Sequence, residues 1–363
     1  MADYRIALIP GDGIGPEVLA EGVKTLDCVA ALDPDLNIAW ESFPWGSAYY
    51  QRTGQMMPPG ALEILRDFDA IYLGAVGSPE VPDHISVRLV LEIRSAFDQY
   101  VNLRPIKLLQ GVQSPLREKG PADIDLVIVR ENTEGEYAPV GGIVFPDTPF
   151  ETATQVNVFT RKGIERIMEY GFNLAQKRRG RLTSVTKSNA LQYSMVLWDK
   201  IFREQACRYP GVAASSVLVD AMAMYLVREP ENFDVVVTSN LFGDILSDLG
   251  AALQGGLGFA PGANLDPSGK NPSMFEPIHG SSPQLAGKGI ANPIATIWAG
   301  SLMLEHLGEE SWSREILAAI EDVLVAGQVR TPDMGGTATT REMGDAIRQR
   351  LRERVQERGV KDG

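Results

Sequence analysis

Two aspartates, Asp244 and Asp248, stand four residues apart in the segment SNLFGDILSDLG. On a helix this spacing places both carboxylates on one face, where like charges repel. Residues 229–269 contain no lysine or arginine, so no cation nearby in the sequence neutralises them. Mg²⁺ or Mn²⁺, which prefer carboxylate and water oxygens, would relieve the repulsion. A bare D-x-x-x-D pattern is more often a solvated helix face, and the surrounding elements must decide between these interpretations.

The elements around this pair favour a site. The apolar run 235–237 predicts a buried parallel strand directly before it, and Asn240 suits the N-cap of the helix that follows. Lys187 and Asp220 stand at or just past the carboxyl ends of two further predicted strands, 182–186 and 216–219. Open α/β sheets bind ligands at this edge. The shared placement therefore predicts one site that includes Lys187, Asp220 and Asp244.

Three arginines stand near the ends of predicted elements. Arg94 lies in the last turns of a predicted helix, Arg104 near the end of a predicted strand and Arg130 directly after an apolar run. The guanidinium fork binds a carboxylate through two parallel hydrogen bonds. These arginines are therefore candidates to converge on one carboxylate. Three separate surface ion pairs are the alternative, which sequence spacing does not exclude.

Strand and helix patterns alternate along most of the chain, which predicts an α/β fold with a mixed, largely parallel sheet flanked by helices. Composition suggests a first α/β domain at 1–100 plus 256–363, with a second domain inserted at 101–255. Further predicted strands lie at 5–9, 37–43, 70–76, 100–105 and 155–159, and residues 141–154 read as a connection or projecting arm. Thr339 and Glu342 form a capping box for a last helix that is expected to run to the chain end.

Bulk properties narrow the class of protein. The 363 residues are 44% hydrophobic and 22% charged, as in ordinary globular proteins. The net charge of −13 argues against nucleic acid or an anionic membrane as a partner. Two cysteines are too few for a disulfide framework, and neither a signal peptide nor a membrane-spanning run is present. A cytoplasmic location is therefore expected. The glycine-rich turn PGDGIGP at 10–16 is weak evidence of a nucleotide site.

Several long segments together resemble the β-decarboxylating dehydrogenases of 2-hydroxy acids, the family of isopropylmalate, isocitrate and tartrate/D-malate dehydrogenases. The resemblance rests on IPGDGIGPEV, DQYVNLRP, VRENTEGEY, TKSN, VDAMAM, SNLFGDILSDLG, FEPIHGSSP and IANPIATIWAG. VPDHIS, VFTRKGI and TPDMGGTATT look most like the tartrate/D-malate branch, whereas VDAMAMYLV looks more like isopropylmalate dehydrogenase. The resemblance implies the two-domain isopropylmalate dehydrogenase fold, which is not a Rossmann domain.

The resemblance also implies roles for the residues named above. Mg²⁺ or Mn²⁺ would be held by Asp244 and Asp248 together with Asp220 of the partner subunit, in a homodimer with shared active sites. The partner's Lys187 would remove, or relay, the hydroxyl proton. Tyr137 would protonate the carbon that loses CO₂, although without the resemblance a packed phenol is the better interpretation. Substrate-binding residues implied by the resemblance are Arg94, Arg104, Arg130 and Val90.

For the cofactor, the segment 276–292 resembles the NAD loop of the family. The implied NAD-binding residues are Ile14, Asn189, Glu276, His279, Gly280, Ser281, Pro283, Gln284, Ile290 and Asn292. Gln284 departs from the pattern, because NAD-using members carry an aspartate there that holds the ribose 2′-hydroxyl. Its loss removes a repulsive element against NADP. No Lys-Tyr pair replaces it, so NAD is still expected, with weaker discrimination. A K⁺ requirement stays open.

The segment before Arg94 also departs from each branch of the family. It lacks the acidic residue of isopropylmalate enzymes at Val87, the serine and asparagine of isocitrate enzymes and a tryptophan of tartrate enzymes. Arg88 lies well off the helix face of Arg94, so a surface role is expected for it.

The expected reaction is therefore oxidation and β-decarboxylation of D-malate or tartrate. A rival is 3-isopropylmalate or another alkyl-malate, for which Val87, Val90 and Leu91 would form an apolar pocket. A catalytically silent binding protein would show losses at Lys187, Tyr137 or the aspartates, and none is lost.

Overall fold

The computed structural model describes residues 2–359, which form two compact units. The first unit comprises the chain up to Gln99, the segment Leu108–Pro121 and the chain from Ala251 onward. The second comprises Tyr100–Lys107 and Ala122–Gly250. Each unit has its own strands and its own covering helices, as an α/β protein requires.

The first unit is built on strands in the order β2-β1-β3-β12-β11. Neighbouring strands are parallel except β11 and β12, which are antiparallel. The apolar run at the centre of β1 is fully buried, as expected for a strand covered on both faces. The bounds are β1 (Ala2–Gly11), β2 (Leu36–Ser42), β3 (Ala70–Ala75), β11 (Pro261–Leu265) and β12 (Ser273–Pro277).

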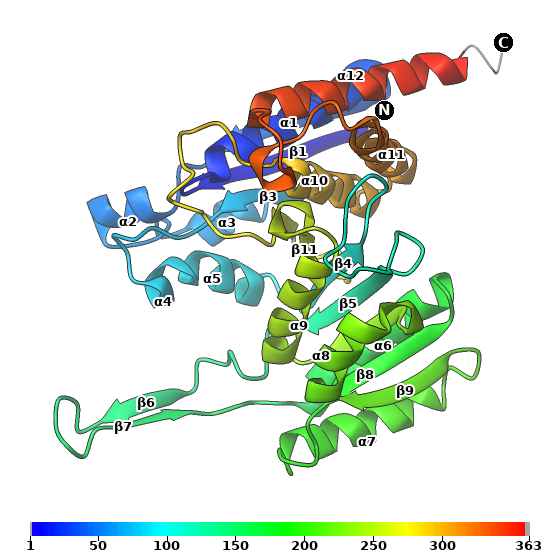
Figure 1. Ribbon diagram of the computed structural model, residues 1–363. Coiled ribbons are helices and arrows are strands. Elements are labelled where there is room, and N and C mark those ends of the chain that lie inside the picture. The colour runs from blue at the N-terminus through cyan, green and yellow to red at the C-terminus, as the bar shows by residue number, and fades with distance from the viewer. Residues whose placement is uncertain (1, 360–363) are drawn as a thin grey trace. The chain divides into compact units, whose positions relative to one another are not determined.

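Helices of the first unit cover these strands, and α1, α10, α11 and α12 pack on one another (Figure 1). Helix α10 is apolar around most of its circumference and almost wholly buried, which identifies it as a core helix rather than a surface helix. The helices of this unit are α1 (Gly15–Leu32), α2 (Ser47–Thr53), α3 (Ala61–Leu65), α4 (Asp83–Ser86), α5 (Arg88–Ala96), α10 (Ile294–His306), α11 (Glu310–Ala326) and α12 (Thr340–Gly359), with 3₁₀ turns η2 (Leu257–Phe259) and η3 (Pro332–Met334).

The second unit has strands in the order β4-β5-β10-β8-β9. Strands β5, β10, β8 and β9 are parallel, whereas β4 runs antiparallel to β5. Helices α6 and α7 pack against these strands and each other. The bounds are β4 (Val101–Lys107), β5 (Asp125–Glu131), β8 (Arg181–Thr186), β9 (Ala213–Leu218), β10 (Val235–Thr238), α6 (Arg161–Lys177), α7 (Ser194–Ala206), α8 (Val219–Arg228), η1 (Pro230–Asn232) and α9 (Asn240–Leu253).

A two-stranded arm extends from the second unit (Figure 1). Strands β6 (Gly141–Val144) and β7 (Thr152–Gln155) pair antiparallel, and all their residues are exposed. Apolar side chains are prominent among them and in the turn, since Phe145 is 66% and Phe150 77% exposed. The predicted strand at 155–159 was therefore wrong in its position. Pairing with β6 ends at Gln155, and Val158 makes only an isolated bridge with Gly135.

The mixed, largely parallel α/β fold expected from the sequence is confirmed. Strands β11 and β12 were missed, because their Pro, Gly, Asn and Ser residues resemble a loop although every residue of both strands is buried. Helix α8 was missed too, and Asp220 lies in its first turn.

The capping box at the start of α12 is confirmed, with the Thr339 and Glu342 backbone N–H groups each donating to the other's side chain. Its predicted continuation through 360–363 lies outside the described residues. No helix among the described residues is long and apolar enough to cross a membrane.

Candidate active site

The centre of the candidate site is Asp244 on α9, whose two carboxylate oxygens both accept hydrogen bonds from the second unit. Oδ1 accepts from Arg104 Nη1 at 3.1 Å and from Arg130 Nη1. Oδ2 accepts from the Tyr137 hydroxyl at 2.7 Å. Side chains that the sequence assigned to metal binding, carboxylate binding and proton transfer therefore meet at one carboxylate.

Sheet register brings the two arginines together. The antiparallel pairing of β4 with β5 sets Asn102 opposite Arg130, so Arg104, two residues further on, lies on the same face. Arg104 Nε donates to Asn102 Oδ1 at 2.6 Å, and Nη1 donates to Ser247 Oγ at 2.5 Å. Both guanidinium groups are buried, and these contacts fix their orientation toward α9.

Arg130 is also held by the first turn of α9. Its Nε and Nη2 donate to Asn240 Oδ1 at 2.9 and 2.7 Å. Asn240 was expected to cap α9, but it is the first helical residue and its side-chain oxygen binds Arg130 instead. A Cβ at Gly243 would lie 2.6 Å from Arg130 Cγ, so this glycine makes room for the arginine. Sequence reasoning missed the roles of Asn240 and Gly243, for which the small residues of SNLFGD were the available signal.

Tyr137 follows β5 in a turn through Gly135, which has a φ of +79°. Burial raises the pKa of the Tyr137 phenol to about 12, and the hydrogen bond to Asp244 contributes to the increase. The charges of Arg130 and Arg104 oppose it. The Arg130 guanidinium lies 5.4 Å from the centroid of the Tyr137 ring. The phenol therefore keeps its proton at neutral pH and is available as a donor.

Asp248, one turn beyond Asp244, differs from it in having no hydrogen bond or ion pair among the described residues. Its side chain is exposed, yet the surrounding protein raises the pKa of the carboxyl, and Asp244 raises it further. Arg104 and Arg130 lower it. Two carboxylates on one helix face, one of them without a cationic partner, suit a divalent cation. Within the described residues of one chain, however, no group of three or more His, Cys, Asp or Glu side chains is arranged to hold a metal.

Lys187 and Asp220 form a pair of their own in the second unit. Lys187, directly after β8, donates from Nζ to Asp220 Oδ1 at 2.6 Å. The ammonium group lowers the pKa of Asp220 through this hydrogen bond. Asp220 is exposed and Lys187 is half-buried, so both can meet a ligand or another chain. Asn189, two residues after Lys187, is exposed as well.

In the first unit, Arg94 near the end of α5 pairs with Glu276 in β12. Arg94 Nη2 donates to Glu276 Oε1 at 2.7 Å, and Asn264 Nδ2 donates to the same oxygen at 2.8 Å. All three side chains are buried. Glu276 was predicted to bind the cofactor, and in the structure its carboxylate orients Arg94. Residues 94 and 276 are far apart in the sequence, which is why the pattern did not indicate this pair.

The predicted cofactor loop follows β12. Its path is fixed by backbone contacts, since the Ile14 N–H donates to the Ser281 carbonyl at 2.8 Å. A Cβ at Gly13 would lie 1.9 Å from that carbonyl oxygen, so the glycine-rich turn needs Gly13 here for close approach. The Asn292 carboxamide donates to Asp333 and accepts from the Ile294 N–H at the start of α10.

The predicted cofactor loop combines exposed residues with one buried polar atom that has no partner among the described residues. The His279 ring approaches the Gly280 carbonyl through Nδ1 at 3.0 Å, while its buried Nε2 has no partner among the described residues. Burial lowers the pKa of His279, so the ring is neutral at pH 7 and Nε2 can accept a hydrogen bond. Gly280 has open space where a Cβ would lie, and Gln284 and Pro283 are exposed. Ile290 is half-buried.

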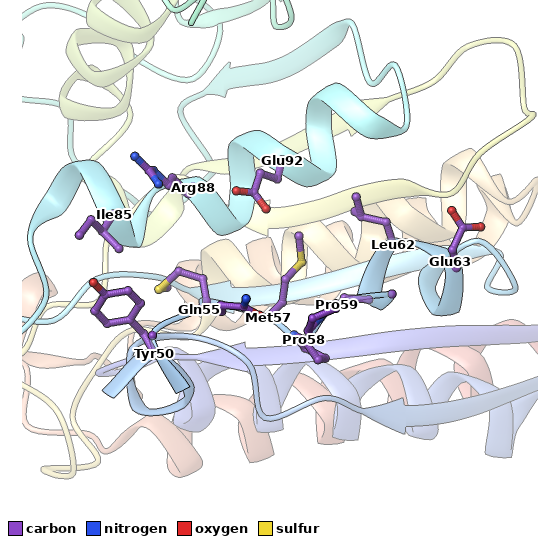
Figure 2. Close-up of a pocket in the computed structure, with 14 residues that line it drawn as sticks. Tyr50, Gln55, Met57, Pro58, Pro59, Leu62, Glu63, Ile85, Arg88 and Glu92 are labelled. Carbon is purple, nitrogen blue, oxygen red and sulfur yellow. The ribbon is translucent and has the colours of Figure 1, made fainter. Parts of the chain in front are cut away.

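Helix α5 presents different residues on different faces. Val90 is 7% exposed and belongs to the apolar core of the first unit. On another face, Arg88 and Glu92 line a cavity of about 540 Å³ together with Met57 and the loop before α3 (Figure 2). Arg88 has no ion pair among the described residues, and its exposed position agrees with the surface role expected for it.

The chain matches a family model described as isocitrate/isopropylmalate dehydrogenase over residues 5–347. It is 51% identical over 358 residues to the tartrate dehydrogenase/decarboxylase of Pseudomonas putida, across 96% of this chain and 98% of that protein. It is 52% identical over 356 residues to the decarboxylating D-malate dehydrogenase of Escherichia coli strain K12, with 96% and 98% covered. Among solved structures, isocitrate dehydrogenase from Methylococcus capsulatus is similar with a TM-score of 0.88 at 38% identity, covering 96% of this chain and 99% of that chain.

Proposed function

Because the chain belongs to the isocitrate/isopropylmalate dehydrogenase family and is a decarboxylating dehydrogenase, we propose that it oxidises the C2 hydroxyl of D-malate or tartrate with loss of CO₂. The convergence of Arg104, Arg130 and Tyr137 on Asp244 carries this proposal. This cluster contains two arginines that could bind a substrate carboxylate. It also contains a tyrosine that could donate a proton and an aspartate suited to a metal ion. The similarity to tartrate and D-malate enzymes supports the choice of a C4 diacid.

Asp244 and Asp248, with Asp220 of the partner subunit, would hold Mg²⁺ or Mn²⁺. When bound, the metal supplies Lewis acidity that makes the C2 hydroxyl easier to deprotonate. Asp244 and Asp248 would bind the divalent metal ion through their carboxylates. Asp248 is available for this because it has no hydrogen bond or ion pair in the described chain. Burial and the neighbouring Asp244 raise the pKa of Asp248, and a bound cation would oppose both effects.

Lys187 would accept the proton of the C2 hydroxyl, directly or through a relay. Arg104 and Arg130, joined by Arg94, would hold the carboxylate that leaves as CO₂ and keep its bond aligned for cleavage. Tyr137 would donate a proton to the carbon left behind, since its phenol is protonated at neutral pH.

When bound, NAD would supply the hydride acceptor. The loop 276–292 would bind its adenosine portion, with His279 Nε2 as an acceptor that has no partner among the described residues. Asn189 and Ile14 would contact it from other segments. Gln284 lacks the negative charge that repels a 2′-phosphate, so we expect NAD to be preferred over NADP by a smaller margin than in enzymes with aspartate there.

We further propose a homodimer in which each site takes Lys187 and Asp220 from the partner subunit. The exposed apolar residues of the β6–β7 arm support it, because such a surface is usually covered by another chain. Helices α8 and α9 add exposed Met224, Val227 and Ile245. Asp220 and Lys187 are paired on one chain, so they would enter a partner's site together.

The alternative substrate is 3-isopropylmalate. Val87 is 43% exposed at the start of α5, and an apolar residue there suits an alkyl group rather than a hydroxyl. Formation of NADH with Mn²⁺ should be followed with D-malate, both tartrate stereochemistries, 3-isopropylmalate and isocitrate, and then with NADP. D-malate or tartrate well ahead supports the proposal. If 3-isopropylmalate is oxidised fastest, the alkyl-malate hypothesis replaces the proposal.

The shared site has its own test. Lys187→Ala and Asp244→Asn each inactivate both sites of a homodimer, whereas a mixed dimer keeps one intact site if Lys187 comes from the partner. Random mixing of equal amounts should restore about a quarter of wild-type activity. Mixtures refolded together that show no more activity than either variant would rule out sharing of Lys187.

A further inference from the structure

Glu136, directly before Tyr137, binds the beginning of the helix that carries Asp244. Its Oε2 accepts from the Leu241 N–H at 3.1 Å, and its Oε1 accepts from the Ser239 hydroxyl at 2.9 Å. Leu241 lies in the first turn of α9, where backbone N–H groups have no partner within the helix. The Glu136 carboxylate therefore serves as the cap that Asn240 does not supply.

Two consecutive side chains thus contact one turn of the same helix. Glu136 fixes its start, and the Tyr137 hydroxyl contacts Asp244 Oδ2, four residues after Asn240. The Glu134 carbonyl adds a third contact by accepting from Asn240 Nδ2 at 3.1 Å. The segment that carries the proton donor is therefore tied to the segment that carries the metal ligand.

We propose that Glu136 is a positioning residue that sets the distance between the Tyr137 hydroxyl and Asp244. This inference rests on the proposed function, in which Tyr137 donates a proton and Asp244 binds the metal. One of the two contacts of Glu136 is to a backbone N–H, whose direction the helix fixes, and the other is to the hydroxyl of the fully buried Ser239. A negative charge at the helix N-terminus adds a favourable interaction with the helix dipole.

A neighbouring glutamate provides the contrast. The Glu134 side chain accepts from the Thr160 N–H at 2.8 Å and the Thr160 hydroxyl at 2.6 Å, at the start of α6. Thr160 Oγ in turn accepts from the Gly163 N–H at 3.0 Å. Helix α6 carries none of the proposed site residues. In Thr160→Ala the Thr160 N–H still donates to Glu134, so this variant removes a helix cap and leaves the contacts of Glu136 and Tyr137 with α9 in place.

The test compares Glu136→Ala and Glu136→Gln with the control Thr160→Ala. Glu136→Ala should lower kcat for the preferred hydroxy acid about 10- to 100-fold, because misplacement of about 1 Å has effects of this size. KM should change by less than about threefold, since Arg104 and Arg130 remain. Glu136→Gln should recover most of kcat, because its amide oxygen still accepts from Leu241. Thr160→Ala should lower Tm about as much as Glu136→Ala and leave kcat unchanged.

Mn²⁺ affinity, measured by calorimetry without substrate, gives a readout independent of turnover. It should weaken in Glu136→Ala and not in Thr160→Ala. If the wild type oxidises no hydroxy acid, the proposed function fails, and Mn²⁺ affinity alone decides the role of Glu136. Equal kcat and equal Mn²⁺ affinity in Glu136→Ala and Thr160→Ala would overturn the inference, as would a Glu136→Gln variant no better than Glu136→Ala. If Glu136→Ala does not fold, Glu136→Asp, which shortens the reach and keeps the charge, takes its place with the same expected split.

Discussion

The proposed catalytic groups of the second unit and the proposed cofactor loop of the first unit are organised in opposite ways. Around Asp244, charged side chains from three elements satisfy one another before any ligand arrives. In the loop after β12, backbone contacts set the shape, and His279 Nε2 has no partner among the described residues. The first arrangement must exchange partners to bind, whereas the second only has to accept a ligand. The two regions should therefore respond differently to substitution.

The largest expected effect comes from Asp244→Asn. Turnover with Mn²⁺ should fall about 10³-fold or more, because a metal ligand contributes several kcal/mol to the transition state. In metal-free protein, by contrast, D-malate should bind about 2- to 10-fold more tightly. The reason is that Arg104 and Arg130 lose an intramolecular carboxylate that competes with the substrate carboxylate. Calorimetric titration of D-malate without metal measures this.

Asp248→Asn is the matched control, because Asp248 contacts neither arginine through a hydrogen bond or ion pair in the described chain. It should weaken Mn²⁺ binding and leave metal-free D-malate affinity unchanged. If both variants bind D-malate without metal as the wild type does, Asp244 does not compete with the substrate for the arginines. The second-unit site then need not exchange partners to bind a ligand.

Two glycine substitutions sharpen the same comparison. Gly243→Ala should destabilise the protein by about 1–3 kcal/mol, because its Cβ would overlap Arg130 Cγ near the backbone, where the arginine cannot swing aside. Gly280→Ala meets open space and should change stability by less than about 0.5 kcal/mol. Urea unfolding of both variants measures the difference. Equal losses would mean that the loop is packed as tightly as the second-unit site.

Gln284→Asp tests whether the exposed residue 284 controls the preference for NAD over NADP. Restoring a carboxylate should lower kcat/KM with NADP about 5- to 10-fold relative to NAD, close to the ~1 kcal/mol between like charges 4 Å apart in water. Gln284→Asn, which shortens the side chain without a charge, separates charge from length. A preference that shifts equally in both variants would exclude repulsion as the cause.

The smallest effect is expected from pH and His279. Burial lowers the pKa of His279 in the folded protein, so the unfolded chain binds more protons as pH falls below its ordinary value of 6.5. The stability associated with the neutral ring is fully present above pH 6.5 and is lost as pH falls through the folded pKa. This term is at most about 1.4 kcal/mol per pH unit.

Stability of His279→Asn and wild type should be compared by urea unfolding between pH 7.5 and 5.5. The wild type should lose more stability than the variant over this range. His306, whose pKa burial also lowers, is present in both proteins and cancels in the difference. Parallel pH dependences would show that His279 is solvated in the folded protein.

Positions of the charged residues were predictable because each stands near the end of an element that its apolar pattern identifies. Their partners were not. Arg104 and Arg130 share Asp244 because β4 runs antiparallel to β5, a pairing that the expected parallel strands did not indicate. Arg94 meets Glu276 through the tertiary fold of the first unit, and no periodicity connects residues so far apart.

The roles of small residues were harder still to predict. Gly243 matters through the volume that Arg130 occupies, and Asn240 through a hydrogen bond across to β5. The helical pattern of α9 predicts neither the space that Gly243 leaves nor the hydrogen bond of Asn240. In that pattern Gly243 and Asn240 are ordinary first-turn residues. The residues of the cofactor loop were predicted from resemblance to a family, and the structure shows that His279 Nε2 in this loop is buried without a partner among the described residues.

A newly synthesised chain carries the β6–β7 arm before it has met another copy of itself. Ile143 is 61% and Phe150 77% exposed on this arm, whose sheet has two strands in the described chain. An exposed strand edge with apolar side chains is a template for pairing with other chains, so it favours aggregation of newly made protein. In the proposed homodimer a matching surface would cover the arm, so the yield of native protein would depend on how quickly two chains meet.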